Sequence, residues 1–188
     1  MQLISKLGGR KAGKSVQPKN SALRAATRSA IELLEARIFL SVTNAWNAAV
    51  SGDFDNPAMW SLGHVPTSGE DAVINVAGSY SVTHNSAAAD SVNSLSSTQP
   101  FTLSAGSLNV ATTVEVDNTF TLSGGKLIHA TILAGTGGQG LTATSNGGTL
   151  DGVTLNANLD LTANQSYLAS VNGMTLNATA TLGQYGRI

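Results

Sequence analysis

The 188-residue sequence contains no cysteine, which excludes disulfide bonds, thiolate metal ligands and cysteine nucleophiles together. No apolar run approaches the roughly 18 residues of a membrane-spanning helix, so we expect no transmembrane span. Cations are scarce beyond residue 37, where Lys126 and Arg187 are the only two. Because a surface that follows nucleic-acid phosphates needs clustered Lys and Arg, we also expect no nucleic-acid partner.

The charges that are present divide the chain into two parts. The formal net charge is +6 over residues 1–37 and −7 over residues 38–188. Residues 1–19 hold five cations, three glycines and little apolar content, which predicts a disordered basic leader. Residues 20–41 are rich in Ala, Leu, Arg and Glu and contain no Gly or Pro, which predicts a helix. A basic amphipathic helix at this place is either an export or membrane-surface element or an ordinary solvated helix.

A short motif lies at the end of this predicted helix. Residues 34–41 read Leu-Glu-Ala-Arg-Ile-Phe-Leu-Ser and resemble the LEPR-XLL motif that opens many very large bacterial extracellular and cell-surface proteins. Ala36 stands where that family has Pro, and Phe39 stands where it usually has Leu. The predicted targeting motif comprises Leu34, Glu35, Arg37, Leu40 and Ser41. The resemblance implies export, to a secreted or cell-surface location, of the N-terminal part of a longer polypeptide.

The rest of the chain is repetitive. From Ile38 onward, Ser, Thr and Asn supply 50 of 151 residues, and glycine supplies 17 more. The segment 101–108 returns nineteen residues later as 120–127, and 152–157 returns twenty-one residues later as 173–178. Three columns of apolar residues follow from these repeats: Val92, Val114, Ile132, Val153 and Met174; Phe101, Phe120, Leu141, Leu159 and Ala180; and Leu108, Leu127, Leu150 and Leu168.

Three short strands per repeat, separated by Gly, Asn and Ser turns, indicate an all-β fold. Apolar columns at a constant phase favour a right-handed parallel β-helix of about four to five coils, with its repeats over residues 91–188. A β-sandwich of antiparallel hairpins is the alternative, because it also has turns at such intervals. The last residues, 183–188, carry no polar cap, so we expect a truncated solenoid that can self-associate through its open C-terminal coil.

Residues 45–90 differ from the repeats and are predicted to form an N-terminal cap and the first coil. Both tryptophans of the chain, Trp46 and Trp60, lie in this segment. Residues 60–74 resemble the opening of bacterial β-helix surface proteins and, more weakly, an eight-glycine extracellular domain. Capping aromatic side chains are the commoner interpretation of the tryptophans, and a sugar-stacking platform is the functional one.

Few residues point to chemistry. Residues 135–140 match G-x-G-x-x-G, but no helix is predicted after them to bind a dinucleotide. His64, His84 and His129 stand alone in the sequence, and residues 53–56 lack the pattern of a calcium loop, so we expect no metal ligands. Asp151 and Asp160 fall in different columns, and Lys126 is the only candidate for a cationic base or clamp inside the repeats. We therefore expect no catalytic and no cofactor-binding residues.

Two functions follow from these observations. The first is a non-catalytic secreted or cell-surface protein, a structural, adhesin-like β-helix that presents a Thr/Asn-rich face to an unknown surface glycan or protein ligand. The word adhesin comes from the resemblance to bacterial surface proteins, whereas composition supplies only the solenoid. The alternative is the N-terminal region of a carbohydrate-active β-helix enzyme whose active site lies beyond residue 188.

Overall fold

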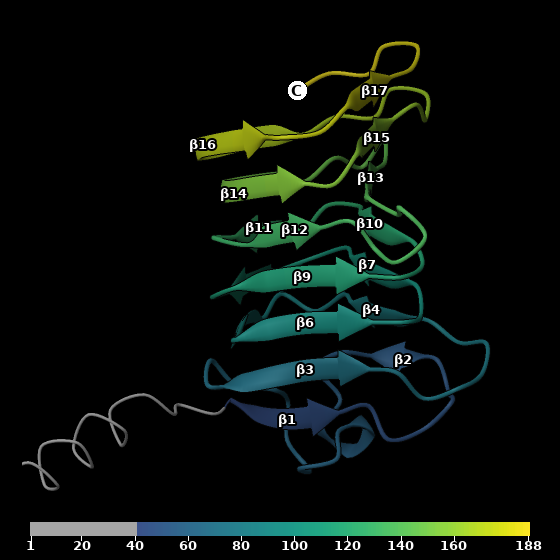
Figure 1. The fold of residues 1–188 in the computed structure, drawn as a ribbon, viewed down its shortest axis with the longest axis vertical. Coiled ribbons are helices and arrows are strands. Elements are labelled where there is room, and N and C mark those ends of the chain that lie inside the picture. The colour runs from purple at the N-terminus through teal and green to yellow at the C-terminus, as the bar shows by residue number, and fades with distance from the viewer. Residues whose placement is uncertain (1–40) are drawn as a thin grey trace, which may run out of the picture. The chain divides into compact units, whose positions relative to one another are not determined.

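A computed structural model describes residues 41–188, which form a right-handed parallel β-helix (Figure 1). Five complete turns are preceded and followed by a partial one. The strands are β1 (Val42–Ala45), β2 (Gly52–Asp53), β3 (Glu70–Ile74), β4 (Val82–His84), β5 (Ala89–Val92), β6 (Ser94–Ser97), β7 (Phe101–Leu103), β8 (Ser107–Val110), β9 (Thr113–Val116), β10 (Phe120–Leu122), β11 (Lys126–Ile128), β12 (Thr131–Leu133), β13 (Leu141–Ala143), β14 (Thr149–Asn156), β15 (Leu159–Leu161), β16 (Ala169–Leu176) and β17 (Ala180–Leu182). One 3₁₀ turn, η1, covers Pro57–Met59. The leader predicted over 1–19 and the helix predicted over 20–41 lie outside the described residues, apart from Ser41.

The strands stack into three faces. A seven-stranded sheet in the order β2-β4-β7-β10-β13-β15-β17 forms one face. A ten-stranded sheet supplies the other two, one built on β1, β3, β6, β9 and β12 and the other on β5, β8 and β11. All pairings between the named strands are parallel. The parallel β-helix predicted from the sequence is therefore confirmed, and the antiparallel sandwich is excluded.

The two longest strands bend around one corner and join two faces into one sheet. The register of β14 against β16 shifts between Asp151 and Val153, where Gly152 has a φ of +61°. The preceding turn has His129 at this corner with a φ of 58°, and the following turn has Asn172 with a φ of 53°. Gly and Asn adopt this left-handed conformation readily, which is why the chain turns here.

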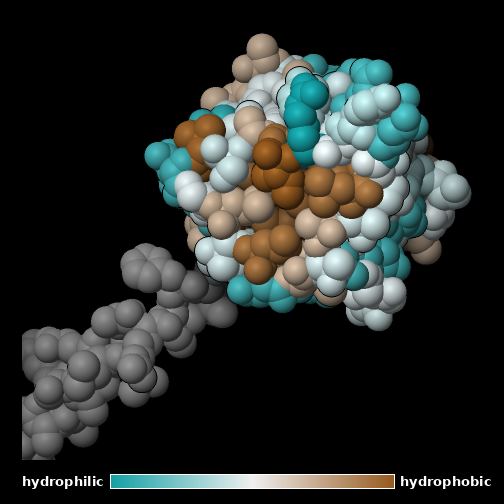
Figure 2. Space-filling model, turned by 90° about the horizontal axis from the view of Figure 1, so that it is seen from above, coloured by the Kyte–Doolittle hydropathy of each residue, from teal (hydrophilic) through white to brown (hydrophobic). Residues whose placement is uncertain are grey.

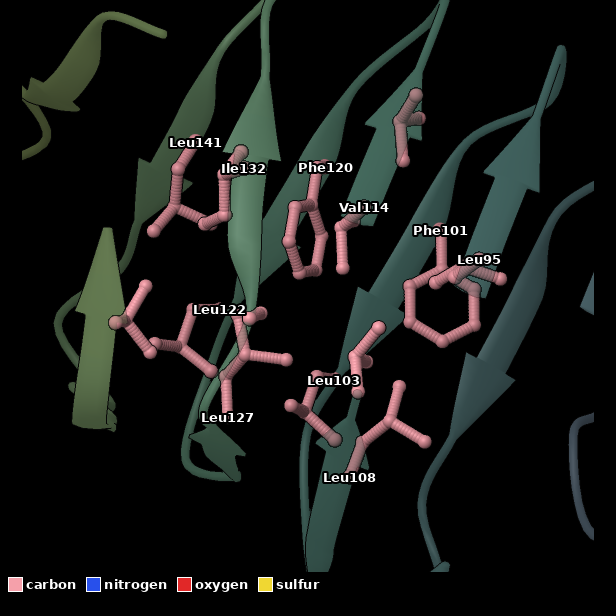
Figure 3. Close-up of a cluster of buried hydrophobic side chains, with 14 of the residues drawn as sticks. Leu95, Phe101, Leu103, Leu108, Val114, Phe120, Leu122, Leu127, Ile132 and Leu141 are labelled. Carbon is pink, nitrogen blue, oxygen red and sulfur yellow. The ribbon is translucent and has the colours of Figure 1, made fainter. Parts of the chain in front are cut away.

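The core lies inside the stacked turns. Strands such as β7 and β10 alternate buried, half-buried and buried residues, so their Phe and Leu side chains point inward and their Thr points outward. The rings of Phe101 and Phe120 are in contact, with centroids 5.8 Å apart and planes tilted by 54°, and Leu141 continues the same column (Figure 3). Burial of identical apolar side chains from turn to turn is the main stabilising contribution in such a solenoid.

Strand register confirms one predicted column and corrects the other two. The column that begins at Phe101 continues in register through Leu159 to Ala180. In the first predicted column, Ile132 pairs with Leu155 rather than Val153. The observed column is Leu95, Val114, Ile132, Leu155 and Leu176, whereas Val92 lies on a different face and pairs with Val110, and Val153 pairs with Met174. In the third column, Leu150 pairs with Ser170 rather than Leu168. Connections of unequal length shift the phase, and counting residues cannot locate such insertions.

Both tryptophans belong to the core cluster near the first turn. Trp46 and Trp60 are each 1% exposed, and their rings meet edge to face with centroids 5.2 Å apart. The Trp60 indole N–H donates a hydrogen bond of 2.7 Å to the Phe54 carbonyl, and the Trp46 indole donates one of 3.2 Å to the Val50 carbonyl. Because both indoles are buried and hydrogen-bonded, neither offers a free ring face on which a sugar could stack.

Candidate functional site

A polar hollow lies at the corner between two faces of the solenoid, where the face built on β1, β3, β6, β9 and β12 leads into the seven-stranded sheet. Its volume is about 600 Å³. Four successive turns supply its lining: Ser51; Gly78, Ser79, Tyr80 and Ser81; Thr98, Gln99 and Pro100; and Asn118. The connection from β3 to β4 extends outward from the solenoid in Figure 1 and carries the largest share of these residues. The hollow therefore depends on stacked turns and on one long connection.

Tyr80 is the only ionisable residue among the lining residues, and it is buried. The side chain is 6% exposed, and its hydroxyl completes no hydrogen bond within the described part of the chain, although it lies near the backbone of Val76. Burial raises the pKa of Tyr80 above its usual value, so the hydroxyl is protonated at neutral pH. A buried polar group without a partner is costly, and a ligand group that accepts a hydrogen bond here would remove that cost.

Hydrogen bonds between backbone groups and serine hydroxyls hold the lining turns in place. The Ser81 amide donates to the Ser51 hydroxyl at 3.0 Å, and the Gly52 amide donates to the Ser81 carbonyl at 3.1 Å. The Ser97 hydroxyl donates to the Gln99 carbonyl at 2.7 Å and accepts from the Gln99 amide at 3.1 Å. These bonds connect neighbouring turns or close a tight bend, so the hollow is preformed rather than assembled by a ligand.

The lining indicates the kind of ligand that fits. Hydroxyl, amide and backbone groups surround one phenol and one proline ring, and none of the lining side chains carries a charge at neutral pH. Such a surface matches a neutral molecule rich in hydroxyl groups better than a phosphate or a carboxylate, which need cationic or clustered amide donors. The sequence missed this site because its residues come from four turns at unequal spacing and match no motif.

The predicted targeting motif is described only at its last residue. Leu34, Glu35, Arg37 and Leu40 lie outside the described residues. The Ser41 hydroxyl donates a hydrogen bond to the Asp71 carboxylate. The same carboxylate accepts bonds from the Asn93 amide at 2.7 Å and from the Ser94 hydroxyl at 2.6 Å. Burial raises the pKa of Asp71, but the hydrogen bonds from Ser41, Ser94 and Asn93 outweigh it and hold this pKa below its usual value.

The acidic residues that the sequence singled out do not converge. Asp151 lies in β14 and Asp160 lies in β15, on different sheets of the solenoid. The Asp151 carboxylate accepts a hydrogen bond from the Asn172 amide at 2.6 Å and lies 2.5 Å from the Lys126 ammonium. Hydrogen bonds from Lys126 and Asn172 hold the pKa of Asp151 below its usual value. Lys126 is therefore engaged in an ion pair between stacked turns rather than poised as a base.

The glycine-rich segment at 135–140 is a loop between β12 and β13. The strand β13 begins directly after it at Leu141. The Gly137 amide donates to the Gln139 side chain at 2.9 Å, and the Thr136 amide donates to Asp117 at 2.7 Å. Because a strand follows the glycines, no helix N-terminus is present there to bind a pyrophosphate.

The last turn of the solenoid exposes apolar residues whose equivalents in earlier turns are buried. Leu161 is fully buried, whereas its register partner Leu182 is 52% exposed. Val171, Tyr185 and Ile188 are also large and exposed. Figure 2 looks onto this end of the molecule and shows apolar side chains gathered near its centre. Within the described residues, β16 and β17 each pair with a strand on one side only, which leaves free backbone groups along their other edge.

Comparison of the chain with protein-family models, with curated proteins and with solved structures found no match. Among the described residues, no helix is both long enough and apolar enough to cross a membrane.

Proposed function

We propose that this chain is a non-catalytic, secreted or cell-surface structural protein of the adhesin-like kind, and that the corner hollow binds a surface glycan. The observation that carries the proposal is the preformed hollow lined by uncharged polar groups, with the Tyr80 hydroxyl in its wall lacking a hydrogen-bond partner within residues 41–188. Pyranose rings offer hydroxyl groups that both donate and accept hydrogen bonds. Their C–H groups can pack on the half-buried Pro100 ring in the lining.

The outward side of the solenoid supports the structural part of this proposal. Threonines in register run along the seven-stranded sheet, and a second row runs along the face that contains β9 and β12. These rows are Thr83, Thr102, Thr121 and Thr142, and Thr113, Thr131, Thr154 and Thr175. Both rows present hydroxyl groups and no charged side chain, which suits a solenoid that displays a binding site. Self-association through the last turn stays a prediction, supported by its exposed apolar side chains.

Tyr80→Phe is expected to weaken glycan binding while leaving the fold intact. The variant removes a buried hydroxyl that has no partner in the described residues, so the free energy of unfolding should stay the same or rise. Loss of one hydrogen bond to the ligand should lower affinity about two- to tenfold. Immobilised neutral polysaccharides, screened with the purified protein, provide the binding measurement.

Tyr185→Phe is the matched control, because Tyr185 is 67% exposed and does not line the hollow. It should bind each polysaccharide as the unmodified chain does. If Tyr80→Phe and Tyr185→Phe bind equally well to every polysaccharide that the unmodified chain binds, the hollow is not the glycan site.

Export is the second expectation of the proposed function, and it rests on the basic leader and on the resemblance at residues 34–41. A reporter fused after Ser41 should leave the cytoplasm of a suitable bacterial host, and deletion of residues 1–41 should retain it. Cell fractionation with a protease-accessibility assay measures the outcome. A reporter that is equally cytoplasmic with and without these residues would remove the argument for a surface location.

A further inference from the structure

Three metal-ligating side chains meet on the first turns, away from the hollow. Asp55 lies two residues after the end of β2, His84 ends β4, and Asp90 lies in β5. The His84 Nε2 atom lies 2.8 Å from the Asp90 Oδ2 atom and 3.9 Å from the Asp55 Oδ1 atom. One ligand atom from each residue falls within 4.8 Å of the other two.

The charges in this cluster are not balanced by the protein groups around it. The His84 side chain is fully buried. Its register partner in the next turn is Leu103, so the histidine occupies a position that the next turn fills with leucine. Two carboxylates face its single imidazole, and the Asp55 Oδ1 atom is buried without a hydrogen-bond partner in the described residues. A buried carboxylate oxygen with no donor calls for a cation.

We propose that Asp55, His84 and Asp90 bind one first-row divalent metal ion of the zinc type. An imidazole nitrogen and two carboxylate oxygens are ligands that zinc accepts, and two carboxylates neutralise its charge. The carboxylate side chains are 17% and 18% exposed, which leaves the ion a path from solvent and a position for water. Calcium fits less well, because it takes six to eight oxygen ligands.

Neighbouring groups contact two of the three ligands, Asp55 and His84. The Ser86 hydroxyl donates to the other carboxylate oxygen of Asp55, and the Asp55 amide donates to Asp53 at 3.0 Å. The Phe54 ring lies beside the His84 ring, with centroids 5.6 Å apart. Such supporting contacts orient ligands and raise metal affinity. A bound ion would connect the first partial turn to the first complete one, so its role is to stabilise that end of the solenoid.

The sequence expectation of no metal ligands rested on spacing. His84 has no second ligand within four residues, and Asp55 precedes it by twenty-nine positions. Parallel stacking brings these positions together because one turn of the solenoid separates them. The polar residues of 53–56 have different roles. Asp53 and Asn56 accept hydrogen bonds from nearby backbone amides, whereas the Asp55 carboxylate lies near the His84 ring.

Titration calorimetry and thermal melts of the full chain, stripped with EDTA and then given ZnCl₂, test the proposal. We expect one zinc ion per chain, a melting temperature that rises with zinc concentration, and visible absorption of a low-symmetry site when Co²⁺ replaces zinc. Asp55→Asn should fold, because the amide keeps the shape of the side chain, but it should weaken zinc binding at least about tenfold. His129→Asn is the control, since Asn tolerates the left-handed backbone at this exposed position.

Two results would overturn the proposal. One is zinc binding that Asp55→Asn leaves unchanged, or that His129→Asn weakens as much, because the ion would then lie elsewhere. The other is an unmodified chain whose melting temperature does not respond to zinc while Asp55→Asn melts higher. In that case a shared proton between the two carboxylates, and not a metal ion, balances the cluster.

Discussion

Ile132→Asp is expected to lower the free energy of unfolding by roughly 3–5 kcal/mol, because it places an unpaired carboxylate inside the stacked core. Ile132 is 1% exposed and lies between Val114 and Leu155 in the same inward column. No described cation lies in that column to pair with the new charge. Urea denaturation followed by circular dichroism measures the loss.

Thr131→Asp is the matched control on the same strand. Thr131 is half-buried and points to the outer side of the sheet, between Thr113 and Thr154. Its substitution should cost about 1 kcal/mol or less, mainly through the lower strand preference of Asp. Equal losses from Ile132→Asp and Thr131→Asp would mean that the inward and outward positions of β12 are assigned wrongly.

Gly106→Ala is the second substitution with a large expected effect. Gly106 has a φ of +60°, and a Cβ atom there would lie 2.2 Å from the Ala88 carbonyl oxygen and 2.6 Å from the Ser86 carbonyl oxygen. The left-handed backbone alone costs about 1–2 kcal/mol for alanine. The overlap with rigid backbone adds about 1–3 kcal/mol, so we expect a total loss of about 2–5 kcal/mol in the free energy of unfolding.

Gly138→Ala separates the two causes. Gly138 has a φ of +82°, but a Cβ atom there would meet no other atom within 4 Å. Only the backbone cost of about 1–2 kcal/mol applies to it. Urea denaturation of both variants checks the difference. A Gly138→Ala variant as unstable as Gly106→Ala would show that the close approach of adjacent turns at Gly106 is unimportant.

The fold was predictable because stacking in register repeats a signal along the sequence. Phe101 and Phe120 occupy the same place in consecutive turns, and so do the threonines beside them. The pattern failed where connections differ in length. Leu168 follows a long connection and therefore falls two positions before Ser170, the residue that pairs with Leu150. Periodicity reports the repeating unit but does not report which residues are inserted in it.

The candidate sites could not be predicted from the sequence, for a related reason. Tyr80 lies in a connection, and only the fold shows that its hydroxyl is buried beside Gln99 and Asn118 from later turns. His84 occupies an inward position of β4, but in the sequence it stands alone, with no second metal ligand nearby. Each site consists of residues from different turns, so its chemistry appears only when strand register is known.

Distances between spin labels test the central claim, the parallel stacking of turns in register, most directly. The chain has no cysteine, so labels can be placed at Thr83 with Thr142 and at Thr83 with Thr181 without background. These outward positions lie in one sheet in the order β4, β7, β10, β13, β15 and β17. At about 4.8 Å per strand, the backbone separations should be about 14 Å and about 24 Å. Pulsed electron paramagnetic resonance should show the second distance longer than the first by about two strand spacings. Equal distances, or a shorter one for Thr83 with Thr181, would contradict the stacked solenoid.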